Sequence, residues 1–260
     1  MILDPILENK RVEVEARKIS VPMAELEERI SFNRKPRDFR AALRQEGISL
    51  IAEVKRASPS KGDILPDVDA VEIAALYEQM GARAISVLTD EKFFKGKLED
   101  LTNVHRHVQI PCLRKEFVID EYQIYEARAA SADAILLIVR CLTDKELMNF
   151  YKLARKLEME VLVETHTAEE ISRALDAGAH IIGINNRDLD TLTVDVNRTL
   201  ELKRMVPGGN TLVSESGIYT REQVETLEAG GVDAILVGES LLTSNDIRGK
   251  MRELLGHDQS

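Results

Sequence analysis

Long apolar runs are missing from this sequence of 260 residues. The N-terminal stretch MILDPILENKRVEVEARK carries charges throughout, and no apolar segment is long enough for a signal peptide or a membrane span. We therefore expect a cytoplasmic protein without a membrane partner. The sequence also lacks any linker or low-complexity segment, so we interpret residues 1–260 as one domain.

Positive charge is scarce as well. Lys and Arg number 35 against 45 Asp and Glu, which gives a net charge of −10. Affinity for nucleic-acid backbones comes mainly from clustered Lys and Arg, so this balance argues against a nucleic-acid partner. It still allows a local positive pocket for a small anion.

Cysteine is rare, and the two residues present, Cys112 and Cys141, do not have the spacing of metal ligands. This favours two reduced thiols. What the chain has in quantity is 44% hydrophobic and 31% charged residues, a composition typical of a soluble globular protein with ample material for a core.

Residues 1–47 carry helical patterns and no strand. Asp4-Pro5 is a typical helix start, a second short helix is expected from Met23 to Ile30, and a third from Arg37 to Arg44. We interpret this part as a helical N-terminal extension and expect it to pack across one end of the fold that follows.

From residue 49 onward, strand-like and helical segments alternate about every 25 residues. The strand-like runs are mostly continuously apolar, as expected of parallel strands covered on both faces. Helical patterns separate them, with N-cap residues such as Asp120, Thr143 and Thr167. Eight such units favour a (β/α)₈ TIM barrel over a doubly wound open sheet. The eight predicted strands are Leu50–Val54, Ala84–Leu88, Pro111–Lys115, Ala134–Ile138, Val161–Glu164, Ile181–Asn185, Thr211–Ser214 and Ala234–Val237.

Ionisable residues gather where these strands end. Glu53 and Lys55 lie on one side of the first strand, because side chains alternate along a strand. A charge at one strand end is usually just solvated, but six strands of eight end this way. In this fold the active site lies at the carboxyl ends of the strands, so we predict an active site there. The other predicted members are Lys115, Glu164, Asn185, Arg187, Glu215 and Glu239.

Glycine and serine follow the seventh and eighth strands, at Ser216-Gly217 and Gly238-Glu239-Ser240. Glycine lets a backbone approach a phosphate closely, and these two loops are the recurrent phosphate position of the fold. We therefore predict a phosphate site here, with Ser58 and Lys55 as further contacts.

The motifs resemble those of the indole-3-glycerol phosphate synthase family from about Leu50 to Leu254, and the N-terminal helices are expected to belong to the same likeness. The motifs that carry it are IAEVKRASPSKG, AISVLTDEKFFKG, LRKEFVIDEYQIYEARA, ADAILLI, LVETHT, IIGINNRDL, LVSESGI and ILVGESLL. The resemblance implies a (β/α)₈ barrel that uses neither metal nor organic cofactor. It also implies a reaction of tryptophan biosynthesis, in which 1-(2-carboxyphenylamino)-1-deoxyribulose 5-phosphate loses CO₂ and water to give indole-3-glycerol phosphate.

The resemblance also implies residue roles. Lys115 is expected to be the general acid of ring closure and Glu164 its acid–base partner, while Lys55 and Glu53 serve dehydration. Further implied positions hold the substrate's amine and hydroxyls (Asn185, Glu215), its phosphate (Ser58, Ser60, Ser216, Gly217, Gly238, Glu239) and its ring (Pro59, Phe94, Phe117, Arg187).

Three other hypotheses remain open at this point. A class I aldolase would use Lys115 or Lys55 as a Schiff-base nucleophile, which needs a lysine of lowered pKa. A phosphoribosylanthranilate isomerase would be expected to use Cys and Asp. A catalytically dead barrel kept for protein interactions is disfavoured by the intact array of ionisable residues. We expect a monomer whose partner is a small phosphorylated substrate.

Overall fold

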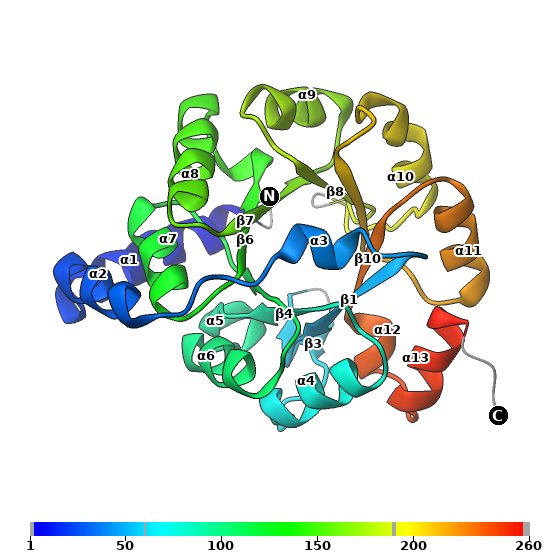
Figure 1. Ribbon diagram of the computed structural model, residues 1–260, viewed down its shortest axis with the longest axis horizontal. Coiled ribbons are helices and arrows are strands. Elements are labelled where there is room, and N and C mark those ends of the chain that lie inside the picture. Colours follow the sequence, from blue (N-terminus) through cyan, green and yellow to red (C-terminus); the bar gives the residue numbers. More distant parts are fainter. Residues whose placement is uncertain (1–2, 60, 189–190, 257–260) are drawn as a thin grey trace.

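Eight parallel strands close into a barrel in the order β1-β10-β9-β8-β7-β6-β5-β4, and helices surround it (Figure 1). The structure, a computed structural model, describes residues 3–59, 61–188 and 191–256. The barrel strands are β1 (Ser49–Val54), β4 (Ala84–Leu88), β5 (Cys112–Lys115), β6 (Ala134–Ile138), β7 (Glu160–Thr165), β8 (Ile181–Asn185), β9 (Thr211–Glu215) and β10 (Ala234–Val237). The predicted (β/α)₈ barrel is thus confirmed, and each predicted strand agrees with an observed one to within one residue at either end.

Helices follow the strands and cover the outside of the barrel. Side chains of Asp120, Thr143 and Thr167 accept hydrogen bonds from backbone N–H groups of the next helix, so the three predicted helix starts are confirmed. The helices are α4 (Ala70–Gln79), α5 (Glu91–Phe94), α6 (Leu98–His107), α7 (Glu121–Ala129), α8 (Asp144–Lys156), α9 (Ala168–Asp176), α10 (Asn197–Leu202), α11 (Arg221–Ala229), α12 (Glu239–Leu242) and α13 (Ile247–Leu255), with 3₁₀ turns η1 (Val139–Cys141) and η2 (Lys203–Met205).

A short antiparallel hairpin, formed by β2 (Ala57–Ser58) and β3 (Gly62–Asp63), stands in the loop after β1. No strand was among those predicted here from sequence, because Ser, Pro and Gly dominate the stretch. Gly62 has a φ of +69°, which glycine adopts without steric cost and which lets the chain turn back.

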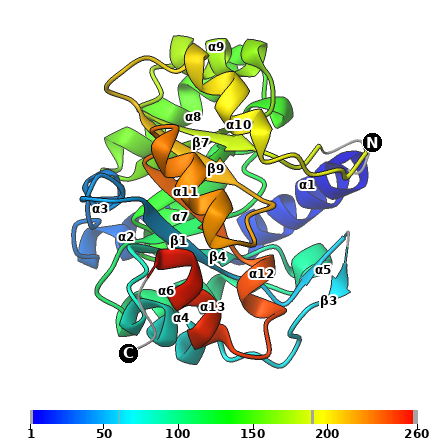
Figure 2. The same cartoon turned by 90° about the vertical axis from the view of Figure 1, so that its right-hand side faces the viewer.

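The N-terminal extension consists of α1 (Leu3–Ser20), α2 (Met23–Phe32) and α3 (Phe39–Leu43). We expected it at one end of the barrel, and it in fact reaches both, with α1 and α3 on opposite sides in Figure 2. Phe39 and Leu43 of α3 are fully buried among the apolar side chains of the barrel interior. Leu3 and Ile6 of α1 lie in the pocket at the carboxyl ends of the strands.

The helix α2 connects these two ends, because it packs along α7 on the outside of the barrel. Leu26 of α2 and Val14 of α1 form an apolar cluster with Tyr122 of α7. At the far end of α7, the Asn33 amide donates to the carbonyl oxygens of Arg128 and Ala129. None of the helices in the described ranges is long and apolar enough to cross a bilayer.

Candidate functional site

The site lies directly above the apolar interior of the barrel, because alternate side chains along each strand point inward. Ile51, Leu113, Leu162 and Val213 are buried in this interior. Side chains two residues further along a strand point the same way, so each of these residues is followed, one layer up, by an ionisable side chain on the same inward face. The four side chains of that upper layer are Glu53, Lys115, Glu164 and Glu215.

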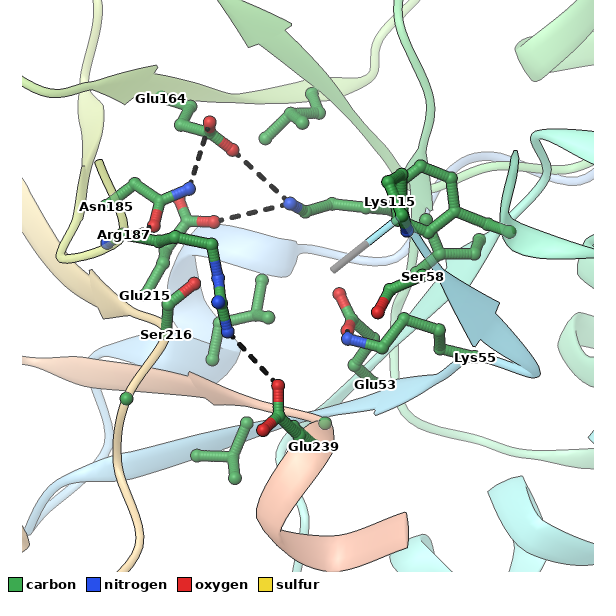
Figure 3. Close-up of a pocket in the computed structure, with 18 of the residues that line it drawn as sticks. Glu53, Lys55, Ser58, Lys115, Glu164, Asn185, Arg187, Glu215, Ser216 and Glu239 are labelled. Carbon is green, nitrogen blue, oxygen red and sulfur yellow. Dashed lines mark hydrogen bonds and ion pairs between the residues drawn. The ribbon is translucent and has the colours of Figure 1, made fainter. Parts of the chain in front are cut away.

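Lys115 lies at the centre of this layer. Its Nζ is 3.3 Å from Glu164 Oε2 and 3.5 Å from Glu215 Oε2. The Asn185 amide donates to Glu164 Oε1 at 3.1 Å. Figure 3 shows the three polar side chains converging on the lysine from β7, β8 and β9, while Lys115 reaches them from the opposite wall. Four residues from four strands therefore form one cluster, in which Lys115, Glu164 and Asn185 are hydrogen-bonded and Glu215 joins through its ion pair with Lys115.

Burial and opposite charge have opposing effects on the pKa values in this cluster. Burial disfavours the charged form of Lys115, but the carboxylates of Glu164, Glu215 and Glu53 outweigh it and raise the pKa of the lysine. Burial likewise opposes ionisation of Glu164, yet Lys115 and His166 lower its pKa below the usual value. Lys115 is therefore a protonated donor and Glu164 an ionised acceptor at neutral pH.

Glu215 differs from Glu164, although both touch the same lysine. Burial, with the carboxylates of Glu164 and Glu53, raises the pKa of Glu215 to about 8 despite the opposing effect of Lys115. No described group forms a hydrogen bond with either carboxyl oxygen of Glu215. Two carboxyls with pKa values pushed apart are suited to opposite proton-transfer roles, one as an acid and one as a base.

A second ion pair lies beside the cluster, where Lys55 Nζ is 2.8 Å from Glu53 Oε1. Both side chains are largely buried, at 13% and 7% exposed. Gly238 makes room for this pair, because a Cβ there would stand only 2.5 Å from Glu53 Oε1 and 2.9 Å from Glu53 Cβ. Similarly, a Cβ at Gly183 would overlap the Glu215 carboxyl.

The predicted anion loops open onto the same pocket. Ser216 and Gly217 have φ angles of +69° and +78°, and a Cβ at Gly217 would overlap the Val194 side chain. Arg187 points into the pocket and pairs with Glu239 at 3.1 Å. Ser58 lines it from the hairpin. Cationic side chains, hydroxyls and a glycine backbone can together hold a phosphate.

Apolar groups complete the walls of the pocket, whose volume is about 160 Å³. Phe94 and Phe117 stand with ring centroids 6.0 Å apart and an interplanar angle of 39°. Three further residues line the pocket that were not predicted from sequence. They are Leu3, Ile6 and Tyr219, and the Tyr219 hydroxyl donates to Glu239 at 2.6 Å. The sequence predicts a helix that starts at Asp4-Pro5 but not that side chains of this helix enter the pocket.

The structure brings together all but one of the predicted site residues. The pocket is lined by Glu53, Lys55, Ser58, Pro59, Phe94, Lys115, Phe117, Glu164, Asn185, Arg187, Glu215, Ser216, Gly217, Gly238 and Glu239. The remaining one, Ser60, lies outside the described residues.

The described ranges hold two cysteines and no cluster of metal-ligating side chains. They contain no group of three or more His, Cys, Asp or Glu residues suited to a metal ion. Cys112 and Cys141 are free thiols, and burial raises the pKa of each, that of Cys141 to about 12. A neutral buried thiol is a poor nucleophile.

Buried charges also tie α1 to the rim of the site. Lys10 is fully buried, with Nζ 2.8 Å from Asp90 Oδ2 and 3.0 Å from Glu116 Oε1. Asp90 caps α5, the helix that carries Phe94, and Glu116 directly follows Lys115. The N-terminal extension thus supports two walls of the pocket.

Fold and site together define an enzyme of the (β/α)₈-barrel class, with its acid–base groups at the carboxyl ends of the strands. A family model described as indole-3-glycerol phosphate synthase matches residues 3–254. The chain is 48% identical to the indole-3-glycerol phosphate synthase of Roseiflexus castenholzii and 47% identical to that of Alkaliphilus metalliredigens, and each match covers 98% of both chains. The chain belongs to the indole-3-glycerol phosphate synthase family.

Solved structures of more distant proteins share the fold. One from a study of the tryptophan synthase complex of Pyrococcus furiosus has a TM-score of 0.59 at 17% identity and covers 80% of this chain and 97% of its own. KGPDC from Streptococcus mutans has a TM-score of 0.61 at 15% identity, with 80% and 95% covered. At these identities the likeness supports the barrel alone.

Proposed function

We propose that this chain is an indole-3-glycerol phosphate synthase, a carboxy-lyase of tryptophan biosynthesis. Its substrate is 1-(2-carboxyphenylamino)-1-deoxyribulose 5-phosphate, and its products are indole-3-glycerol phosphate, CO₂ and water. The observation that carries this proposal is the Lys115 ammonium, held between Glu164 and Glu215 on the floor of a pocket that also has aromatic walls and anion-binding loops.

Lys115 is the general acid of ring closure. As the aromatic ring carbon attacks the ribulose carbonyl, its oxygen develops negative charge, which a positioned ammonium stabilises and then protonates. The raised pKa of Lys115 keeps the proton on the amine until that moment. The same raised pKa argues against the aldolase hypothesis, since a Schiff-base lysine must be deprotonated to attack a carbonyl.

Glu164 and Glu215 divide the acid–base work opposite Lys115. Glu164, ionised and held by Asn185, accepts a proton as the closed ring is converted to product. Glu215, protonated near neutral pH, donates a hydrogen bond to a substrate hydroxyl. Asn185 and Glu215 together orient the amine and hydroxyl region of the substrate.

The Glu53–Lys55 pair serves dehydration. A departing hydroxyl needs a proton, and the Lys55 ammonium supplies it while Glu53 holds the lysine at 2.8 Å. Lys115 is thus the proton donor in ring closure, and Lys55 is the proton donor in dehydration.

The remaining residues bind the two ends of the substrate. Its phosphate lies against Ser58, Ser216, Gly217, Gly238 and the backbone at Glu239, remote from the reacting atoms, so that its binding energy orients the substrate. The aromatic ring lies between Phe94 and Phe117, beside Pro59 and Arg187. The apolar wall made by Leu88, Leu136 and Ile138 suits loss of CO₂, because a carboxylate is less stabilised there than in water.

We further propose that residues 1–260 act as one domain and as a monomer in the cytoplasm, without a nucleic-acid or membrane partner. The proposed reaction needs neither metal nor organic cofactor, since every proton that it moves has a side chain of this chain to donate or accept it.

A fluorescence assay for indole-3-glycerol phosphate, run with purified protein and the carboxyphenylamino substrate, tests the proposal. We expect turnover in the presence of a metal chelator, and near-abolition in Lys115→Ala and Glu164→Ala. Borohydride trapping with substrate provides the control for mechanism, because a covalent adduct at Lys115 or Lys55 would contradict a synthase and support an aldolase.

A further inference from the structure

A buried histidine stands directly behind Glu164 and takes no part in the steps above. His166 is 4% exposed and follows β7, two residues after Glu164. Its Nε2 is 3.6 Å from Glu164 Oε1, and its Nδ1 is 3.3 Å from Glu170 Oε2. The imidazole thus lies between two carboxylates, one in the site and one on the outer side of the barrel.

Glu170 is held as an anion. Its Oε2 accepts from the backbone N–H of His166 at 2.7 Å, and its Oε1 is 3.4 Å from Arg140 Nε. Burial opposes this charge, but the hydrogen bonds and charge from His166 and the Arg140 guanidinium lower the pKa of Glu170 below its usual value. An ionised carboxylate can only accept, so Nδ1 of the imidazole carries its hydrogen.

The other nitrogen then faces a conflict. In a neutral imidazole with Nδ1–H, Nε2 presents a lone pair. That lone pair would point toward Glu164 Oε1, which is also an acceptor, and no described group forms a hydrogen bond with Nε2. Two buried acceptors facing each other are unfavourable, and one proton placed between them removes the conflict.

We infer that His166 is a positioning residue that shares one proton with Glu164 across the Nε2–Oε1 gap. This inference rests on the acid–base role proposed for Glu164. While Glu164 is ionised, the proton is bonded to Nε2. To give a proton to the substrate, Glu164 first takes this one, so that the Nε2–H bond breaks and an Oε1–H bond forms. The Oε1–H bond then breaks as the proton passes to the substrate, which leaves Glu164 ionised and a lone pair on Nε2. When Glu164 later takes a proton from the substrate, the same transfer runs in reverse.

The proposed reaction consumes a proton, which the pair of His166 and Glu164 could supply. The substrate carboxylate and its hydroxyl leave as CO₂ and water, so one proton is taken up for each turnover. The imidazole, Glu170 and Arg140 connect Glu164 to a second pocket, which Arg140 and Cys141 line. The charged and titratable groups around the relay are Lys115, Cys141, Glu164, Glu170, Arg140 and, beyond the lysine, Glu215.

Two substitutions separate proton sharing from simple support. His166→Asn keeps a donor toward Glu170 and loses contact with Glu164, whereas His166→Gln keeps a donor toward Glu164 that cannot pass its proton on. We expect both to lower kcat about 10- to 100-fold and to change KM less than about threefold. His166 lowers the pKa of Glu164, so its removal should move the acidic limb of the pH–rate profile to higher pH.

Glu170→Gln is expected to shift the same limb in the same direction by a smaller amount. Its matched control is Glu146→Gln. Both glutamates stand at the third position of a helix that begins after a threonine N-cap, but the Glu146 carboxylate turns back to Thr143. Glu146→Gln should leave kcat and the pH profile unchanged.

Nitrogen-15 spectra of the histidine side chains test the shared proton without turnover. The Nε2 signal of His166, assigned as the one that remains when the other four histidines of the chain are replaced, should move when Glu164 is changed to Gln. The inference is overturned if the Nε2 signal stays in place when Glu164 is changed to Gln. It is also overturned if His166→Gln has the wild-type kcat, or if kcat falls without any shift of the acidic limb of the pH–rate profile. If the wild-type protein turns over no substrate, the proposed function fails. The spectra still show whether His166 and Glu164 share a proton, even where the His166 variants do not fold.

Discussion

Glu215→Gln probes the balance of charge at the centre of the site, because it removes a carboxyl group that is protonated in the folded protein. Burial, together with the carboxylates of Glu164 and Glu53, raises its pKa from 4.5 to about 8. Between these two values the native state binds a proton that the unfolded chain releases. The stability that Glu215 contributes is therefore fully present below about pH 4.5 and is lost as the pH rises through about 8.

The size of the effect follows from the shift. A change from 4.5 to about 8 corresponds to at most about 5 kcal/mol. When Glu215 ionises, it gains attraction to Lys115, whose own pKa the carboxylates raise. We therefore expect the free energy of unfolding to change with pH by only about 2–3 kcal/mol. Glutamine has the same shape and fits against Gly183, where a Cβ would have overlapped the side chain.

Thermal unfolding of both proteins at pH 5 and pH 9 measures this contribution. From pH 5 to pH 9 the wild type should lose more stability than Glu215→Gln. The Tm of the variant relative to that of the wild type should therefore rise by about 5–10 °C between the two pH values. Glu225→Gln, at a side chain that is 59% exposed, is the control and should follow the wild type. Parallel curves for wild type and Glu215→Gln would refute a protonated Glu215. The stabilised variant should nevertheless be the poorer catalyst, since an amide N–H is a weaker hydrogen-bond donor to the substrate hydroxyl than a carboxylic acid O–H.

Three further predictions concern the lysines and one glycine of the site. Lys115→Met should lower kcat by about 10²–10⁴ in the fluorescence assay with little change in substrate affinity, and a fall in affinity alone would contradict its role as an acid. Gly238→Ala should reduce kcat/KM and stability together, because the new methyl group must displace the Glu53 carboxylate 2.5 Å away; unchanged kinetics would show that the pair has room to move. Lys10→Met should cost about 3–5 kcal/mol in urea denaturation, since it leaves Asp90 and Glu116 buried without their cation, and a loss below about 1 kcal/mol would count against this network.

The repeating pattern of strands and helices could be predicted from sequence because it depends on local properties. Continuous apolar runs, N-cap residues and turn glycines act within a few residues of one another, and each predicted barrel strand lies within one residue of the observed one. The hairpin of β2 and β3 could not be predicted this way, because two-residue strands carry too little pattern to distinguish them from a loop.

The site shows the same division. Period-two alternation determined that Glu53, Lys115, Glu164 and Glu215 share the inward face above the apolar interior, and closure of the barrel brings them to one mouth. Sequence alone could not say which carboxyl stays protonated. The pKa of Glu215 differs from that of Glu164 because of distances to Lys115, to His166 and to Asn185, and those distances exist only once the strands are side by side.

By itself, then, the sequence determined the barrel, the family motifs and a set of strand-end residues that line one pocket, because these follow from periodicity and from residue type. Only the tertiary structure decided that the N-terminal extension reaches both ends of the barrel. Only it decided that Leu3 and Ile6 enter the pocket and that His166 stands behind Glu164. The physical reason is that contacts between residues far apart in the chain, and the burial that shifts a proton from one group to another, depend on packing that no local pattern records.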